Sequence, residues 1–438
     1  MKVLLVIHGY PPRYNAGSEV YTQTLAHGLK DATTEVSVFT REEDPFLPDY
    51  HLREEVDPLR PEIPVFLVNH ARSNSRFRNI EIDRVFNSVL EKVQPDVVHF
   101  GHLNHLSTSL IEVAKKFGSK VVFTLHDFWL MCPRGQFLQW GLTESEPWKL
   151  CDGQENRKCA EKCFNRFVTG LDDENEGSGV AYWKQWIGER MSHVRNMCEK
   201  VDLFIAPSRR LRQRHIEEFG IREDRISYLD YGFDLDRLSN RDRTKEDPFV
   251  FGYIGRHHPS KGIDHLLQAF SNLIGNCKLR IWGRPEGQLT NAMKRMQEEL
   301  AISAGSIDWL PEYQNENIVR DVFDHCDCIV VPSIWDENSP LVIHEAQQLG
   351  VPLITANHGG MGEYVQDGVN GLTFKHRDPN DLQRVMQKAL NEPEIMKELG
   401  RRGYLFSSDG IIPSIEEHVI AIIDNYKKLR SENDEGSR

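Results

Sequence analysis

Residues 329–364 read IVVPSIWDENSPLVIHEAQQLGVPLITANHGGMGEY, and this stretch decides the fold. The apolar run Ile329 to Val331 is typical of a buried parallel strand. Pro340 suits the first turn of a helix that packs apolar side chains inward and ends at Gly350. A second strand follows at Pro352 to Ala356. Strand, loop, helix and strand in this order predict a right-handed crossover unit, whose ligands bind at the carboxyl ends of the strands.

Two carboxylates frame the predicted helix. Glu337 lies in the loop before it, and Glu345 lies about one and a half turns inside it, where it could accept hydrogen bonds from a ribose diol. A helix N-terminus has unpaired N–H groups and positive potential, so it favours a phosphate. The residues placed to hold that phosphate are Asn338, Ser339, Pro340 and Leu341. By themselves, two glutamates at one spacing are equally well explained as solvated surface charges.

The string ENSPLVIHEA at 337–346, followed by GVPLI at 350–354 and by Gly359-Gly360, resembles the donor-nucleotide signature of the retaining glycosyltransferases of family 4. The resemblance implies an α/β protein with the GT-B fold, in which two Rossmann-like, doubly wound parallel-sheet domains face a cleft. It also implies a UDP-sugar or GDP-sugar donor, with Glu337 at the sugar hydroxyls and Glu345 at the ribose.

The chain has 438 residues, which fits two domains of about 200 residues each. Its 39% hydrophobic and 27% charged residues are typical of a soluble globular protein. No window of 18 or more apolar residues appears, so we expect a cytoplasmic protein. The net charge of −13 argues against nonspecific binding of nucleic acid, which needs a basic surface.

Two basic runs stand out against this acidic background. The first consists of Arg72, Arg76 and Arg78, and the second of Arg209, Arg210, Arg212, Arg214 and His215. The ordinary interpretation of such a run is a solvated helix face. The alternative is a peripheral contact with the anionic inner face of a membrane, or with a lipid-linked phosphate acceptor.

Alternating strand and helix patterns predict doubly wound sheets in both halves. We place the first domain at residues 1–240, the donor domain at 241–410, and at 411–438 a last helix that crosses back to the first domain before a disordered tail. Strands are predicted at 2–8, 36–40, 65–69, 97–101, 120–126 and 203–207, and then at 249–255, 278–283, 307–310 and 371–374. Ser18 is a good N-cap for a helix over 19–29, and the acidic stretch 172–179 predicts a mobile loop.

Two residues of the first domain are identified through the resemblance. The loop Gly9 to Gly17 follows the first strand, and it resembles the family's glycine loop, which approaches the donor diphosphate and the acceptor; Gly17 is the residue that matches. His126 ends its strand, where such folds place ligand groups. A histidine there is more often structural, but family members have one that reaches toward the donor sugar.

Half of the eight cysteines fall within about thirty residues of an insertion at about 130–180: Cys132, Cys151, Cys159 and Cys163. Disulfides are rare in the cytoplasm, and gathered thiolates indicate a tetrahedral structural zinc site. The spacings do not match a paired CxxC site. An iron–sulfur cluster, redox use and four unconnected thiols remain as alternatives.

The second domain begins with the strand Phe249 to Gly255. Arg256 follows at the strand end, and Lys261 stands at the entry to the next helix, so both can reach one diphosphate. Basic residues in a loop are usually solvated. The pair resembles the family's Arg and Lys clamp in its position, in its spacing from the glutamate motif and in its flanking glycine.

The sequence holds no aspartate pair with metal-binding spacing beside a nucleotide strand, and no phosphate-loop lysine motif. We therefore predict that Arg256 and Lys261 stabilise the leaving diphosphate without a catalytic metal. The resemblance implies retaining transfer of a sugar to a glycan, lipid-linked or small-molecule acceptor, as in the synthesis of cell-surface polysaccharides, with His126 steadying the sugar. The alternatives are a sugar-nucleotide epimerase and a catalytically silent nucleotide-binding scaffold.

Overall fold

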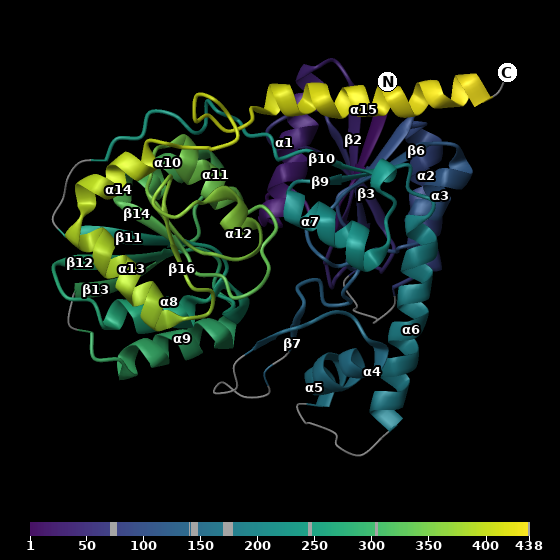
Figure 1. Cartoon of the computed structure of the whole chain (residues 1–438). Coiled ribbons are helices and arrows are strands. Elements are labelled where there is room, and N and C mark those ends of the chain that lie inside the picture. The colour runs from purple at the N-terminus through teal and green to yellow at the C-terminus, as the bar shows by residue number, and fades with distance from the viewer. Residues whose placement is uncertain are drawn as a thin grey trace. The chain divides into compact units, whose positions relative to one another are not determined.

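The computed structural model describes residues 1–70, 77–139, 141, 148–169, 178–243, 248–302 and 305–436. Contacts divide the chain into two compact units, each built on its own sheet (Figure 1). The first unit comprises residues 1–135, 153–233 and 413–438, and the second comprises residues 136–152 and 234–412. The acidic stretch 172–179, predicted to be a mobile loop, lies outside the described residues as far as residue 177.

The first unit contains an eight-stranded sheet in the order β10-β9-β6-β5-β1-β2-β4-β3. Its strands are β1 Lys2–Val6, β2 Glu35–Glu42, β3 Leu52–Val56, β4 Pro64–Asn69, β5 Val97–Phe100, β6 Lys120–Thr124, β9 Leu203–Ala206 and β10 Ile226–Tyr228. Every neighbouring pair is parallel except β3 and β4. The strand β3 was not predicted, because its sequence LREEV is polar and half exposed at the sheet edge.

The first unit also contains the following helices. They are α1 Gly17–Asp31, α2 Ile80–Val93, α3 Leu110–Phe117, α4 Asn156–Cys159, η1 Ala160–Asn165, α5 Arg166–Thr169, α6 Ser178–Cys198, α7 Arg209–Arg214, η2 His215–Phe219, η3 Glu223–Arg225 and α15 Ile415–Gly436. The predicted cap of the first helix is wrong. Ala16 is the N-cap residue, and Ser18 lies inside the first turn, where its hydroxyl donates to the Glu19 carboxylate.

The last helix, α15, packs against α1 of the first unit. A Cβ on Gly28 of α1 would lie 2.7 Å from a methyl carbon of Val419, so the glycine allows the two helices to approach closely. Tyr426 adds a hydrogen bond of 2.6 Å between its hydroxyl and Nδ1 of His99 on β5. Helix α15 continues to Gly436, so the chain end that was expected to be disordered is helical up to that residue.

The second unit contains a six-stranded sheet in the order β13-β12-β11-β14-β15-β16, and all of its pairs are parallel. The strands are β11 Phe249–Ile254, β12 Cys277–Trp282, β13 Gly305–Leu310, β14 Cys328–Val331, β15 Leu353–Ala356 and β16 Leu372–Phe374. The helices are η4 Pro259–Lys261, α8 Ile263–Ser271, α9 Gly287–Glu299, η5 Asn315–Asn317, α10 Ile318–Asp321, η6 Phe323–His325, α11 Leu341–Gln348, α12 Gly359–Tyr364, α13 Pro379–Asn391 and α14 Pro393–Gly400. A two-stranded antiparallel ribbon, β7 Leu138–Gln139 and β8 Lys149–Leu150, also belongs to this unit.

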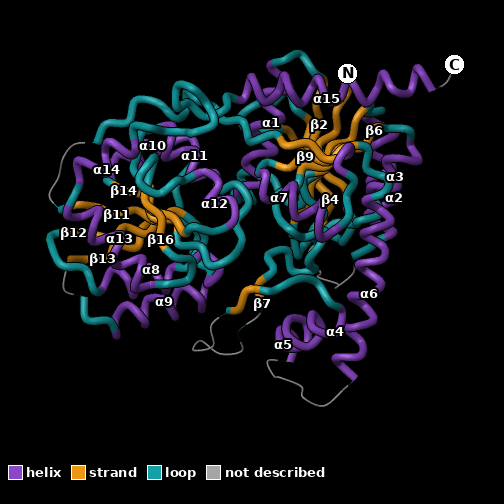
Figure 2. Tube along the Cα trace, in the orientation of Figure 1, coloured by secondary structure: helices purple, strands orange, loops and turns teal. Residues whose placement is uncertain are grey.

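The predicted crossover unit of the second sheet is confirmed. Strand β14 lies between β11 and β15, and all residues of β14 and β15 are buried. Helix α11 connects them, and Pro340 is its N-cap residue, one position before the first helical residue. In each unit the strands lie at the centre and helices surround them (Figure 2). The α/β class with doubly wound parallel sheets, predicted from the alternation of elements, is therefore confirmed.

In the part of the chain that the structure describes, no helix is both long enough and apolar enough to cross a membrane.

Candidate functional site

The carboxyl ends of β11, β14 and β15 meet at one edge of the second sheet, because these neighbouring strands are parallel. The loop after β11 carries Arg256 and Lys261, and the loop after β14 carries Glu337. These residues were predicted as one site, and the structure brings Lys261 and Glu337 into direct contact. Their side chains form an ion pair in which Lys261 Nζ lies 2.5 Å from Glu337 Oε1.

Glu337 is buried, with 6% of its surface exposed. Its Oε1 atom also accepts hydrogen bonds from the Ser333 hydroxyl at 2.6 Å and from the Trp335 indole N–H at 2.8 Å. Lys261 lies over the Trp335 ring, 5.3 Å from its centroid. A buried carboxylate needs paired partners, and here three donors fix a single oxygen. All three of these bonds go to Oε1, and none of them goes to the second oxygen, Oε2.

Glycines allow the loops of this edge to touch. At Gly262, φ is +71°, and a Cβ would lie 2.0 Å from the Pro332 carbonyl oxygen. At Gly360, a Cβ would lie 1.4 Å from the Asn338 carbonyl oxygen, and the Gly360 N–H donates to the Glu337 carbonyl at 2.7 Å. The Ile334 N–H donates to the Ser260 carbonyl at 2.9 Å. The backbone of the loops is thus fixed before any ligand binds.

The predicted phosphate-binding residues lie at the start of α11. Asn338 and Ser339 are buried, while Pro340 and Leu341 are half-buried. Glu345 is buried inside α11, with 6% of its surface exposed. Sequence reasoning missed the partner of Glu345, which is Arg237. Arg237 donates to Glu345 Oε1 at 3.0 Å and to the Asn315 carbonyl at 3.0 Å.

Arg256 lies at the same edge but contacts a different carboxylate. Its Nε donates to Glu286 Oε1 at 2.6 Å, and its side chain is 57% exposed. Glu286 was not predicted, because it follows β12 and comes close to Arg256 only through the pairing of β11 with β12. The two cations of the predicted clamp therefore hold two separate carboxylates.

In the first unit, His126 follows β6 at the carboxyl edge of the sheet. Its Nδ1 is hydrogen bonded to the Tyr231 hydroxyl at 2.7 Å. The ring centroid of Tyr21, from the second turn of α1, lies 5.2 Å from the ring centroid of His126. Burial lowers the pKa of His126 to about 3, and His102 contributes in the same direction. His126 is thus a neutral imidazole, suited to hydrogen bonding rather than to carrying a charge. Gly17, also predicted, is the first residue of α1.

Asp127 supports the loop beside His126. Its Oδ1 accepts the Trp129 N–H at 2.7 Å, and its Oδ2 lies 3.4 Å from His102 Nε2. Burial alone would raise the pKa of Asp127, but His102 and the Trp129 N–H outweigh it, so the pKa lies below its ordinary value. Asp127 is therefore an ionised anchor of the loop.

The predicted zinc ligands do not form a visible metal site. Cys132, Cys159 and Cys163 are buried and Cys151 is half-buried, and Cys151 belongs to the second unit by its contacts. Among the residues that the structure describes, no three Cys, His, Asp or Glu side chains come together in a group that could hold a metal. Zinc binding therefore gains no support from the geometry and stays a prediction from the spacing.

Most described side chains of the second basic run make local contacts. Arg212 donates to Glu223, Arg214 donates to Glu218, Arg209 lies over the Tyr228 ring, and His215 is fully buried. Of the first run, Arg72 and Arg76 lie outside the described residues. These contacts favour the ordinary interpretation of the second run, a helix whose charges are locally paired.

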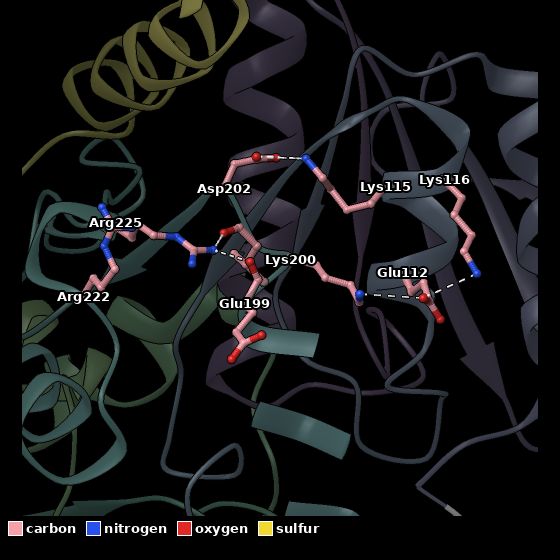
Figure 3. Close-up of a pocket in the computed structure, with 9 residues that line it drawn as sticks. Glu112, Lys115, Lys116, Glu199, Lys200, Asp202, Arg222 and Arg225 are labelled. Carbon is pink, nitrogen blue, oxygen red and sulfur yellow. Dashed lines mark hydrogen bonds and ion pairs between the residues drawn. The ribbon is translucent and has the colours of Figure 1, made fainter. Parts of the chain in front are cut away.

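A charged cavity of about 570 Å³ lies at the edge of the first sheet opposite to the carboxyl edge that carries His126 (Figure 3). Lys115 pairs with Asp202 at 2.9 Å, and Glu112 receives Lys116 at 3.4 Å and Lys200 at 3.7 Å. Its residues precede β6, β9 and β10, so they lie at the amino ends of these strands. Parallel sheets bind ligands at the carboxyl ends, so this cavity is the weaker candidate.

Models of two glycosyltransferase families match the chain. A family model described as Glycosyltransferase Family 4 matches residues 15–237, and one described as Glycosyl transferases group 1 matches residues 236–406. The two models together span nearly the whole chain. The second contains the predicted site residues from Arg256 to Glu345, and the first contains Gly17 and His126.

Among curated relatives, the D-inositol 3-phosphate glycosyltransferase of Geodermatophilus obscurus is 30% identical over 205 residues, which cover 43% of this chain and 45% of the relative. That of Nocardia farcinica is 28% identical over 244 residues, which cover 52% of each protein. The chain thus spans about half the length of the curated relatives it matches.

Solved structures resemble the chain over nearly its full length. Sucrose-phosphate synthase from Thermosynechococcus elongatus has a TM-score of 0.70 at 17% identity, covering 98% of this chain and 99% of that one. Anabaena HepE, solved in complex with UDP and glucose, has a TM-score of 0.69 at 16% identity, covering 98% and 100%. At these identities the likeness shows a common fold.

Proposed function

Since the chain belongs to glycosyltransferase family 4 and has the GT-B fold, we propose that it transfers a sugar from a nucleoside-diphosphate sugar to an acceptor with retention of configuration. The donor is a UDP-sugar or a GDP-sugar, and the acceptor is a glycan, a lipid-linked glycan or a small molecule. The observation that carries the proposal is the contact of Lys261 with the buried carboxylate of Glu337 at the carboxyl edge of the second sheet.

We assign the leaving group to Arg256 and Lys261. As the bond between sugar and diphosphate breaks, negative charge grows on the phosphate oxygen, and two fixed cations stabilise that charge more in the transition state than in the ground state. Lys261 is held in place by Glu337, so it needs little reorganisation when the donor arrives. The N-terminus of α11, at Asn338 to Leu341, adds N–H groups and positive potential for the same diphosphate.

The other residues are assigned to the sugar and the ribose. Glu337 Oε2 accepts a sugar hydroxyl, while its Oε1 atom stays with its three donors. Glu345 holds the ribose diol and is oriented by Arg237. His126, as a neutral imidazole, accepts or donates a hydrogen bond at the donor sugar. Anabaena HepE has been solved in complex with UDP and glucose and in complex with UDP-glucose, which supports the uridine nucleotide as the first to test.

A thermal-shift screen tests the donor assignment. The full chain is heated with UDP, GDP, UDP-glucose and GDP-mannose, and one nucleotide family should raise the melting temperature, because ligand at a hundred times its dissociation constant stabilises by about 2.7 kcal/mol. Glu345→Ala should weaken the shift. Lys375→Ala, at an exposed lysine of the same unit, is the control and should keep it. A folded wild-type chain that responds to none of the four ligands contradicts the proposal.

Product analysis then separates transfer from the two alternatives. A transferase releases nucleoside diphosphate in proportion to glycosylated acceptor or, more slowly, to free sugar. An epimerase converts the donor to its isomer without releasing nucleotide, and a silent scaffold binds the donor and leaves it unchanged. Release of UDP or GDP that Lys261→Ala slows about a hundredfold to a thousandfold is the result we expect.

A further inference from the structure

The pair formed by Arg256 and Glu286 has no role in the assignment above. Arg256 follows β11, and Glu286 is the N-cap residue of α9, which follows β12. The two strands pair in parallel from Phe249 with Cys277 to Ile254 with Trp282, so their carboxyl ends are neighbours. At that edge, Arg256 Nε donates to Glu286 Oε1 at 2.6 Å.

The loops that carry the pair are firmly joined. At Gly283, φ is +137°, and a Cβ would lie 1.9 Å from the Gly255 carbonyl oxygen, so the two backbones touch. The His257 N–H donates to the Arg284 carbonyl at 3.0 Å, and the Glu286 N–H donates to the Thr290 hydroxyl at 2.8 Å. Glu286 is therefore held beside Arg256 by the backbone and does not meet it by chance.

The two ion pairs of this edge differ in how easily they open. Glu337 is 8% exposed at its side chain and is fixed by two further donors in addition to Lys261. The Arg256 side chain is 57% exposed and that of Glu286 is 19% exposed. An exposed ion pair is weak because water and salt screen it. The Arg256 pair is thus the one that can exchange its partner without unfolding the loops.

A carboxylate and a phosphate present the same kind of charged oxygen to a guanidinium. The bond to Glu286 uses Nε of Arg256, so a diphosphate that binds the guanidinium through that N–H must replace Glu286. We propose that Glu286 is an internal counter-ion: it occupies Arg256 in the empty site, yields to the donor diphosphate, and recaptures Arg256 as the nucleoside diphosphate departs. This inference rests on the proposed function, and it adds a residue that weakens product binding and speeds product release.

The charge of Glu286 decides whether its replacement tightens or weakens the binding of the nucleoside diphosphate. Glu286→Gln keeps a side-chain oxygen that can accept from Arg256 but removes the negative charge that competes with the ligand and repels it. Removing a weak ion pair and one repulsion should tighten nucleoside-diphosphate binding about three- to tenfold. The change should lie in a slower dissociation rate, because interface changes act mostly on dissociation. Inhibition by product should become stronger by a similar factor.

The experiment measures the equilibrium and dissociation rate constants of UDP and of GDP, by calorimetry and stopped-flow displacement, on the full chain. The variants are Glu286→Gln, Arg256→Ala and the double variant, with Glu299→Gln, an exposed carboxylate of the same helix α9, as the control. We expect tighter binding and slower release in Glu286→Gln, no change in Glu299→Gln, and no effect of Glu286→Gln once Arg256 is replaced. Coupling through Arg256 distinguishes a counter-ion from a merely structural residue.

Two results would overturn the inference. If wild type binds a nucleotide but Glu286→Gln binds it equally or more weakly, Glu286 does not compete for Arg256, and the proposed function still stands. If Glu286→Gln still changes nucleotide binding in the Arg256→Ala background, Glu286 does not act through Arg256, and the proposed function again stands. If wild type binds neither UDP nor GDP, the proposed function fails, and the inference fails with it.

Discussion

Lys261 Nζ and Glu337 Oε1 lie 2.5 Å apart and join the loop after β11 to the loop after β14. A cation that we assign to the diphosphate is thus already paired with a carboxylate that we assign to the sugar. The pair gives a buried glutamate the partner that a buried carboxylate needs, and it holds a lysine with a flexible stem in place for a leaving group.

Arg237 should be a strong determinant of stability in the second unit. It forms an ion pair with Glu345, and the two side chains are 15% and 8% exposed. Arg237→Met leaves a buried carboxylate without its cation, so we expect a loss of about 3 kcal/mol in the free energy of unfolding. Adding Glu345→Gln should restore part of the loss.

Urea denaturation measures both Arg237 variants. The control is Arg384→Met, whose pair with Asp381 has a 65% exposed arginine and should cost less than about 1 kcal/mol. If Arg237→Met costs no more than this control, the buried pair does not matter for the fold.

Acid should lower the free energy of unfolding of the first unit through two histidines at α15. Burial lowers the pKa of His99 to about 3 and that of His418 to about 4, and both are hydrogen bonded to tyrosines that fix α15. In the unfolded chain both titrate near about 6.5, so below that pH the unfolded state takes up protons first. Stability is therefore complete above about pH 6.5 and falls toward pH 4, by up to about 1.4 kcal/mol per pH unit for each histidine.

Urea midpoints at pH 7.5, 6.5, 5.5 and 4.5 measure this loss. His99→Gln removes one titrating group, so its stability should depend less steeply on pH than that of wild type. His51→Gln, at an exposed histidine, is the control and should show the wild-type slope. Equal slopes in all three proteins would show that His99 does not titrate on unfolding.

If Arg256 and Lys261 supply the positive charge at the diphosphate, as we propose, sugar transfer should continue in a chelator that removes Mg²⁺ and Mn²⁺. The measurement is nucleotide release before and after addition of the chelator. Activity that disappears and returns with either ion would contradict this. Activity that returns only with Zn²⁺ would instead indicate a structural metal.

Elemental analysis tests the cysteine prediction. If Cys132, Cys151, Cys159 and Cys163 bind zinc, a folded and active sample contains about one equivalent per chain, and replacing Cys159 by Ser lowers it. Replacing Cys277, a buried cysteine of β12, should leave it unchanged. Iron with visible absorbance would indicate a cluster, and no metal would indicate four thiols.

The pattern of the sequence predicted the parts of the fold that depend on local order. The apolar run of β14 and the helix between Pro340 and Gly350 lie where expected, because burial on both faces leaves a continuous hydrophobic signal. Strand β3 was missed because its edge position tolerates the polar sequence LREEV. The Ser18 cap failed because α1 begins at Gly17, two residues before the predicted first helical residue, Glu19.

Partners that come together only through the tertiary fold could not be predicted. Tyr231 lies 105 residues after His126, and Arg237 lies 108 residues before Glu345. Glu286 gives no local signal, because its importance comes from the register of β11 and β12. The family motif predicted charged residues of the candidate site but not the side chains that contact them.

The most direct test of the account is the comparison of donor affinity with turnover in Lys261→Ala and Arg256→Ala, with Lys375→Ala as the surface control. If these cations stabilise the departing diphosphate, turnover at saturating donor falls about a hundredfold to a thousandfold, while the donor dissociation constant changes much less. Glu345→Ala should instead raise mainly the Michaelis constant, since the ribose contact is made equally in both states. Clamp variants that bind the donor weakly but turn over at the wild-type rate would contradict leaving-group stabilisation.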